Sequence, residues 1–143
     1  MSHQVHVLFV CTGNSARSQM AEAFARYYGK GRIEASSCGI DPKGLHPLTV
    51  KVMAEKGMDV SRQESKALTN EMLREADVVV TVCGHADEHC PALPPHVHKL
   101  HWPIDDPAIL SGRAPEEALV AFRQARDELE SRVREFLSTL ERQ

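Results

Sequence analysis

Residues 7–18 read Val7-Leu8-Phe9-Val10-Cys11-Thr12-Gly13-Asn14-Ser15-Ala16-Arg17-Ser18. An apolar run ends at Cys11, a short turn of small residues follows, and residues 19–25 begin a helix-like apolar pattern. This pattern predicts a strand, a loop and a helix in immediate succession. Such a loop directs several backbone N–H groups inward, and the N-terminus of the helix adds its partial positive charge.

The predicted loop has the composition of an oxyanion site that contains a nucleophile. Its inward backbone donors suit a tetrahedral oxyanion, and the planar guanidinium of Arg17 can hold two anion oxygens at once. Positive surroundings favour the thiolate of Cys11, which we therefore expect to be a nucleophile at neutral pH. The expected oxyanion ligands are Thr12, Gly13, Asn14, Ser15, Ala16 and Arg17. The alternative is an inert, buried cysteine at a strand end, although such cysteines are seldom followed by a Gly-Asn turn and an arginine at this spacing.

A cysteine followed after five residues by Arg-Ser resembles the phosphate-binding loop of the low-molecular-weight protein tyrosine phosphatases. The longer string from Cys11 to Glu22, Cys-Thr-Gly-Asn-Ser-Ala-Arg-Ser-Gln-Met-Ala-Glu, is closer still to the thioredoxin-coupled arsenate reductases built on that phosphatase fold. Many of those reductases carry a second cysteine where this chain has Ala16. That difference removes a thiol but leaves the nucleophile and the arginine in place. The resemblance extends over nearly the whole chain.

Length and composition fit one soluble domain over residues 1–143, with enough chain for a sizeable core. The formal charge of −3 argues against nucleic acid as the main partner. No apolar run approaches the roughly 20 residues that span a bilayer. Residues 1–4 lack a basic segment followed by an apolar one, so we expect a cytoplasmic monomer with reduced thiols. We expect no metal and no tightly bound cofactor.

Strand and helix patterns alternate along the chain, which predicts an α/β domain with a parallel sheet. The resemblance implies the same architecture, a three-layer sandwich in which helices flank a four-stranded parallel sheet on both faces. The last helix has apolar residues near the 3.6-residue period. Its apolar positions are Ala118, Phe122, Ala125, Leu129, Val133, Phe136, Leu137 and Leu140. The predicted strands are 5–10, 33–38, 76–82 and 98–102, and the predicted helices are 18–29, 47–56, 69–75 and 115–142.

Three chemically active segments follow predicted strands. Cys11 follows the first, Cys83 follows the third, and Asp105 with Asp106 follows the fourth. In parallel sheets ligands bind beyond the carboxyl ends of the strands, so we expect these residues to converge.

Asp106 is the expected general acid, because a thiolate mechanism benefits from an acid that protonates the departing oxygen. In the phosphatase relatives the acid directly precedes a proline, as Asp106 precedes Pro107 here. The alternative is that both aspartates only start a turn, in a polar loop that Gly112 closes. Phosphatases that act on phosphotyrosine usually place aromatic residues after this proline. Ala108 and Ile109 follow here, which argues against an aryl phosphate substrate.

The resemblance implies a redox role for Cys83 and Cys90, since the reductase family has cysteines that match both at this spacing. In the implied route, Cys11 attacks arsenate and forms a covalent thiol–arsenate adduct. Cys83 then attacks the sulfur of Cys11, so that arsenite leaves and a Cys11–Cys83 disulfide forms. Finally Cys90 attacks Cys83, and thioredoxin reduces the resulting Cys83–Cys90 disulfide.

Geometry adds a hypothesis about residues 83–90. In a helix, cysteines seven residues apart lie about 10.5 Å apart along the axis. A disulfide needs Cα atoms within roughly 7 Å. The segment must therefore be bent or unwind on oxidation, and we favour unwinding because Gly84 and Pro91 flank it as hinges.

Two other interpretations of this segment stay open. Cys83, His85, His89 and Cys90 include zinc-type ligands, but adjacent His89 and Cys90 fit a closed tetrahedral site poorly. Alternatively Cys83 only packs at a strand end and Cys90 is an incidental loop thiol. Cys38 matches no redox position and is expected to be a small buried residue near the loop.

Asn14 is expected to hold the loop, because its amide can bond backbone groups and it tolerates left-handed dihedrals. In the family, Ser18 is placed to donate a hydrogen bond to the nucleophilic thiolate. Some members bind potassium through residues that match Asn14, Glu22 and Ser37. An acidic residue completes that site where this chain has Lys66, whose ammonium could replace the ion, so we do not predict bound potassium.

The sequence thus predicts a thioredoxin-coupled arsenate reductase, with phosphate or sulfate as competing oxyanions. One rival is a low-molecular-weight phosphatase, which would need only Cys11, Arg17 and Asp106. Another is a non-catalytic oxyanion-binding or thiol-sensing protein. Glutathione with glutaredoxin, or mycothiol, could replace thioredoxin as the reductant. Weak phosphatase activity would be compatible with reduction, because the first chemical step is shared.

Overall fold

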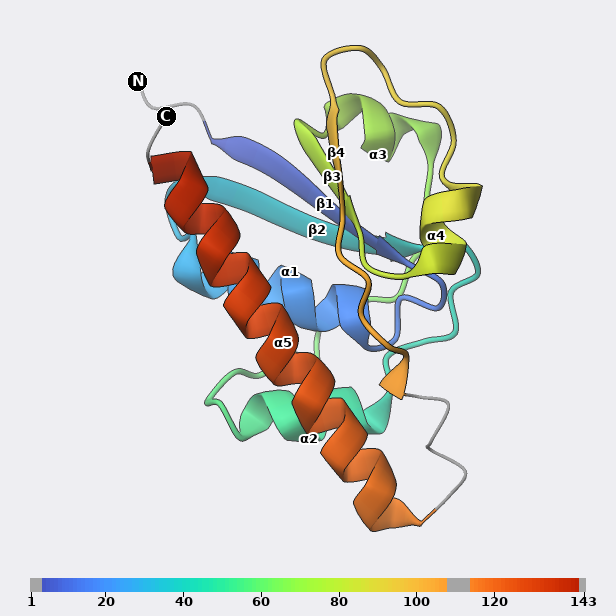
Figure 1. The fold of residues 1–143 in the computed structure, drawn as a ribbon, viewed down its shortest axis with the longest axis vertical. Coiled ribbons are helices and arrows are strands. Elements are labelled where there is room, and N and C mark those ends of the chain that lie inside the picture. Colours follow the sequence, from blue (N-terminus) through green and yellow to red (C-terminus); the bar gives the residue numbers. More distant parts are fainter. Residues whose placement is uncertain (1–3, 108–113, 142–143) are drawn as a thin grey trace.

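A computed structural model describes residues 4–107 and 114–141 (Figure 1). In this part of the chain, β1 (Val5–Cys11), β2 (Ile33–Gly39), β3 (Val78–Thr81) and β4 (His98–His101) form one four-stranded sheet. Neighbouring strands are parallel, and their order is β2-β1-β3-β4. The predicted parallel α/β sheet is therefore confirmed.

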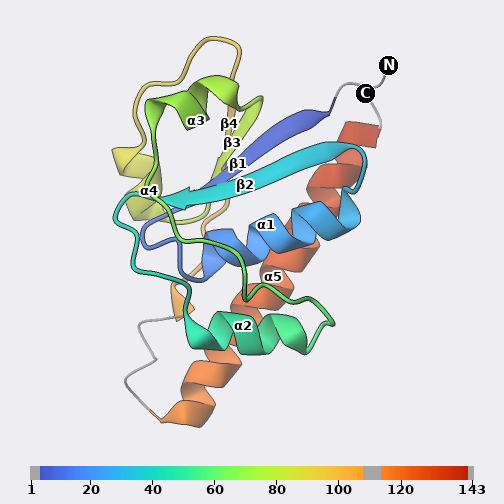
Figure 2. The same ribbon diagram turned by 180° about the vertical axis from the view of Figure 1, so that it is seen from behind.

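Helices cover both faces of the sheet, as the three-layer prediction requires (Figures 1 and 2). One face carries α1 (Arg17–Tyr28) and α5 (Pro115–Glu141), with α2 (Pro47–Ala54) packed beside them. The other face carries two short helices, α3 (Asn70–Glu75) and α4 (Gly84–His89). None of the described helices is long and apolar enough to cross a membrane.

The central strand β1 is buried from both sides, which explains why its sequence is a continuous apolar run. Phe9 packs against Trp102 with ring centroids 5.9 Å apart, and Trp102 meets Phe136 of α5 at 6.2 Å. The predicted apolar positions of α5 are buried or partly buried against this core.

Several predicted boundaries differ from the structure by one to a few residues. The strand predicted over 76–82 is shorter, because its first residues lie at the edge of the ladder, where the Asp77 carboxylate accepts the His6 N–H at 2.8 Å. The helix predicted over 47–56 ends at Ala54, and a turn that closes at Gly57, with φ of +77°, follows it. Ala108, Ile109 and Gly112, and the predicted end of α5 at Arg142, lie outside the described residues.

Glu55 fastens α2 to α5 through two arginines. Its carboxylate accepts hydrogen bonds from Arg123 at 2.6 and 3.0 Å and from Arg126 at 2.7 Å. Arg126 also donates to the Val52 carbonyl at 3.0 Å, which satisfies a backbone acceptor at the end of α2. The hydrogen bond from Arg123 is the largest cause that lowers the Glu55 pKa, from 4.5 to about 2.

This contact predicts a pH-dependent stability difference between the parent and Glu55→Gln. A carboxylate whose pKa is lowered in the folded chain stabilises it above the unfolded pKa, and that contribution disappears as the pH falls through the folded pKa. Thermal unfolding should show the full difference at pH 7 and a shrinking difference between pH 4.5 and about 2. The matched control is Glu75→Gln, at the exposed end of α3. A Glu55→Gln difference that stays constant with pH would contradict this account.

Candidate functional site

The candidate site lies in the loop between β1 and α1, for which the sequence predicts oxyanion binding. Cys11 ends β1 with 2% of its surface exposed, and it lies opposite Gly39 of β2. A Cβ atom at Gly39 would stand 2.7 Å from the Thr12 carbonyl oxygen and 2.9 Å from the Asn14 nitrogen. The loop can therefore fold back over the sheet edge only because residue 39 has no side chain.

Asn14 holds the loop from beneath. Its φ of +47° lies in the left-handed region, and its side chain is fully buried. The Oδ1 atom accepts the Lys66 backbone N–H at 2.9 Å, while Nδ2 donates to Ser18 at 2.7 Å and to Ser37 at 3.0 Å. The expected anchoring role of Asn14 is thus confirmed by its contacts. Its backbone N–H points at the sulfur of Cys11, at 3.2 Å.

Ser18 lies directly beside the nucleophile candidate. Its Oγ atom is 2.8 Å from Cys11 Sγ. Because that oxygen already accepts a hydrogen bond from Asn14, its own hydrogen is free to point at the sulfur. The geometry matches a hydroxyl that stabilises a thiolate.

Arg17 and Asp106 converge on this loop from different ends of the chain. Arg17 is 7% exposed, and its Nη1 donates to the Ile104 carbonyl at 3.0 Å. Its Nη2 lies 3.6 Å from the Asp106 carboxylate. The parallel sheet thus brings the residues that follow β1 and β4 to one edge, as the strand pattern predicts.

A cavity of about 390 Å³ opens above the loop. Five of the six expected oxyanion ligands line it, together with Cys11 and Asp106: Thr12, Gly13, Ser15, Ala16 and Arg17. The sixth, Asn14, lies beneath the loop and contributes its N–H to the sulfur instead.

His46 and Lys43 also line this cavity, and neither is predicted from the sequence as a site residue. His46 is the N-cap of α2, and its Nδ1 accepts the Leu48 N–H at 3.0 Å, so a neutral ring carries its proton on Nε2. Burial lowers the pKa of His46, and the Asp106 carboxylate raises it by a smaller amount. A histidine directly before Pro47, at a helix start, was the available signal.

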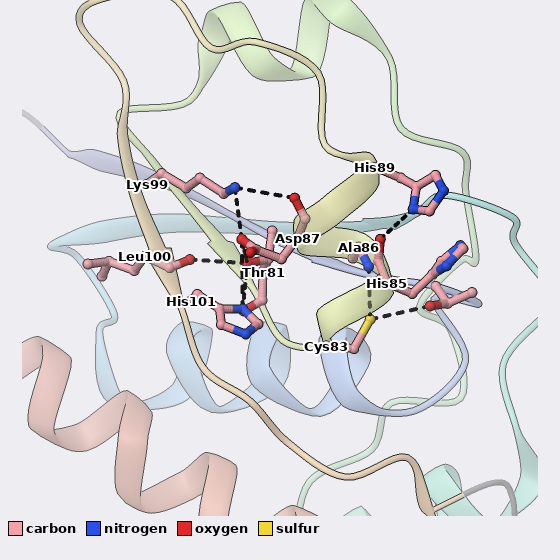
Figure 3. Close-up of polar contacts among 10 residues, drawn as sticks. Thr81, Cys83, His85, Ala86, Asp87, His89, Lys99, Leu100 and His101 are labelled. Carbon is pink, nitrogen blue, oxygen red and sulfur yellow. Dashed lines mark hydrogen bonds and ion pairs between the residues drawn. The ribbon is translucent and has the colours of Figure 1, made fainter.

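Cys83 and Cys90 bracket α4. Figure 3 shows Cys83 at the start of this helix. Cys83 is the N-cap of the helix, and its sulfur accepts the Ala86 N–H at 3.3 Å. The same sulfur is 3.3 Å from the Thr12 hydroxyl, so it lies against the loop that contains Cys11. Cys90 is the C-cap and is partly exposed. Burial raises the pKa of Cys90, and the positive charge of Lys99 lowers it by a smaller amount.

Cys38 is fully buried in β2, opposite Val10 of β1. Burial, with smaller electrostatic contributions from the nearby Cys11 and Cys90 thiols, raises the pKa of Cys38 to about 12. A thiol with so high a pKa is almost entirely protonated at neutral pH and is a poor nucleophile. All four cysteines lie within the described residues and are free.

The buried carboxylate of Glu22 pairs with an arginine rather than with Lys66. Ser37 donates to Glu22 at 2.7 Å, and Arg26 lies 2.9 Å from the same carboxylate, one turn along α1. Lys66 contacts Asn14 through its backbone N–H, and in the described ranges the cation that pairs with Glu22 is Arg26. In the described ranges, no cluster of three or more His, Cys, Asp and Glu residues is arranged to hold a metal ion.

A thiol at the end of a strand, with the Asn14 N–H directed at its sulfur and Arg17 at the start of the next helix, is the arrangement of a phosphatase-type domain. The chain belongs to the low molecular weight phosphotyrosine protein phosphatase family, whose pattern matches residues 6–143.

The similar proteins include arsenate reductases. One from Bacillus subtilis (strain 168) is 46% identical over 133 residues, which is 93% of this chain and 95% of that protein. The solved structure of an arsenate reductase in the phosphate binding state matches with a TM-score of 0.76 and 34% identity, over 95% of this chain and 98% of that one. A thioredoxin-dependent arsenate reductase from Corynebacterium glutamicum matches with a TM-score of 0.79 and 29% identity, over 98% of this chain but 63% of that one.

Replacement of Asn14 tests how far the loop depends on its side chain. Asn14→Ala removes two donated hydrogen bonds and leaves the Lys66 N–H without its acceptor. We expect the free energy of unfolding to fall by about 2–4 kcal/mol. Urea unfolding can be followed by the fluorescence of Trp102, the single tryptophan. The exposed Asn70 provides a control, for which Asn70→Ala should change stability by at most about 0.5 kcal/mol. If Asn14→Ala and Asn70→Ala have the same free energy of unfolding, the Asn14 side chain does not anchor the loop.

Proposed function

We propose that this chain reduces arsenate to arsenite and uses Cys11, Cys83 and Cys90 in sequence. The observation that carries the proposal is the position of Cys83. Its sulfur lies 3.3 Å from Thr12 in the oxyanion loop, and a second thiol, Cys90, stands at the other end of the same short helix. A phosphatase has no chemical need for this pair. The arsenate reductases among the similar proteins support the assignment.

The first step is nucleophilic attack. Arsenate binds to the N–H groups of the loop and to Arg17, and the Cys11 thiolate attacks arsenic. The As–O bond opposite the sulfur breaks, and Asp106 gives its proton to the departing oxygen, which leaves as water. Ser18 and the Asn14 N–H stabilise the thiolate before the attack. The product is a covalent thiol–arsenate adduct in which arsenic is still pentavalent.

The second step transfers two electrons. The Cys83 thiolate attacks the sulfur of Cys11, and a Cys11–Cys83 disulfide forms. The electron pair of the S–As bond stays with arsenic, which leaves as trivalent arsenite. In the third step Cys90 attacks Cys83 and releases Cys11 as a thiol, which leaves a Cys83–Cys90 disulfide.

The third step requires α4 to unwind. Both thiols are free and the segment between them is helical, so the cysteines are separated by the length of that helix, about 10 Å. A Cys83–Cys90 disulfide brings their Cα atoms to within roughly 7 Å. Bonding at Cys83 also changes the cap of α4, because the same sulfur accepts the Ala86 N–H. Oxidation therefore removes one contact that holds the helix.

We propose thioredoxin as the reductant of the final disulfide, with support from the structural neighbour named as thioredoxin-dependent. Partial exposure of Cys90 gives a reducing thiol access to one end of the disulfide. We further propose that the chain acts as a single-domain cytoplasmic monomer, and that phosphate or sulfate competes for the loop.

The test is arsenate-dependent oxidation of NADPH in the presence of thioredoxin and thioredoxin reductase. The parent chain should turn over, and Cys83→Ser should lose at least about 100-fold, because arsenite cannot leave without the attacking thiol. Cys38→Ala is the matched control, since that thiol is buried and protonated, and it should retain turnover.

A different result would identify a rival function. If the parent and Cys83→Ser both hydrolyse a phosphate ester and neither oxidises NADPH, the chain is a phosphatase. If neither variant turns over any oxyanion but both bind phosphate, the site is not catalytic.

A further inference from the structure

The helix between Cys83 and Cys90, α4, is too short to be stable in isolation. With six residues, α4 is far shorter than the roughly 12 to 15 residues at which isolated helices become even marginally stable. Contacts with the rest of the protein must therefore hold it. Ala86 is buried against the core, and the main polar attachment comes from Asp87, which faces β3 and β4 (Figure 3).

The Asp87 carboxylate is held by three neighbours. Lys99 Nζ lies 2.8 Å from Oδ1 and also donates to the Asp87 backbone carbonyl at 3.4 Å. Thr81, which is fully buried, donates to the same Oδ1 at 3.1 Å. His101 completes the cluster, with Nδ1 2.9 Å from the Thr81 hydroxyl and 3.9 Å from Oδ1. The hydrogen bond from Lys99 is the largest cause that lowers the Asp87 pKa, so the carboxylate is ionised at neutral pH.

The opposite side of α4 is attached more weakly. His85 and His89 are exposed, and their rings pack on each other with centroids 4.1 Å apart. The His89 ring bonds within the helix, to the His85 carbonyl at 2.9 Å. Within the described part of the chain, Asp87 is the residue of α4 whose side chain makes polar contacts with the strands.

We propose that Asp87, Lys99, Thr81 and His101 form a latch that keeps α4 helical and thereby sets how readily the Cys83–Cys90 disulfide forms. The proposal rests on the proposed function, because it takes these two thiols as the redox pair. A contact present in the dithiol and absent from the disulfide stabilises the dithiol by its own free energy. The latch residues are positioning residues, since they touch neither the oxyanion nor the reacting sulfurs.

The latch predicts a changed thiol–disulfide equilibrium in Asp87→Asn. The measurement uses the full chain with Cys11→Ser, equilibrated in dithiothreitol redox buffers, and counts free Cys83 and Cys90 by alkylation and mass spectrometry. Asp87→Asn should shift the equilibrium toward the disulfide by about five- to tenfold, the scale of one partly exposed charge-assisted contact. A tenfold change corresponds to a potential that is more negative by ~30 mV.

Matched variants distinguish loss of the latch from nonspecific effects of a substitution on the thiol–disulfide equilibrium. Lys99→Met should shift the equilibrium in the same direction as Asp87→Asn. Asp41→Asn removes another aspartate–lysine pair of the same 2.8 Å length, between Asp41 and Lys43, and should shift nothing. In the reduced chain, hydrogen exchange should be faster across residues 84–90 in Asp87→Asn and unchanged in β1, which shows that the rest of the fold is intact.

The outcomes also separate the latch from the proposed relay. If the Cys83–Cys90 disulfide forms but neither Asp87→Asn nor Lys99→Met moves its potential, the latch is refuted and the relay stands. Unchanged protection of residues 84–90 would refute the latch in the same way. If no Cys83–Cys90 disulfide forms in any background, the relay and the latch fail together.

Discussion

The side-chain amide of Asn14 is the contact on which the site depends. Asn14 has a left-handed backbone conformation. Its side chain donates hydrogen bonds to Ser18 and Ser37, and it accepts the backbone N–H of Lys66, which lies far along the chain. The Ser18 hydroxyl beside Cys11 is held in place by this one buried side chain.

The parallel sheet supplies the second constraint, because it gathers residues that the sequence separates. Cys11 ends β1, while Cys83 and Asp106 follow two other strands. Cys83 contacts Thr12 and Asp106 contacts Arg17, so all three lie around the loop after β1. Gly39 permits the close approach of the loop to β2 that this gathering requires. In the proposed reaction, oxyanion binding and disulfide exchange share this site, because Cys83, the N-cap of α4, lies 3.3 Å from Thr12 of the loop.

The strands, the long helix and the oxyanion loop could be predicted from the sequence, because each rests on local pattern. Residues 7–18 contain the apolar run, the turn and the arginine in one stretch, and α5 carries a regular apolar stripe. Other features depend on distant partners. No local pattern shows that His46 lines the cavity beside Cys11 and Asp106. The helical state of residues 84–89 likewise depends on Lys99 and Thr81, which lie elsewhere in the chain.

The most direct test of the relay is a single turnover by Cys90→Ser with arsenate and no reductant. Without Cys90 the reaction should stop at the second step. We expect about one equivalent of arsenite per chain and a disulfide that joins the peptides containing Cys11 and Cys83, found by mass spectrometry without reduction. Free Cys83 and no released arsenite after incubation with arsenate would contradict the proposed role of this thiol.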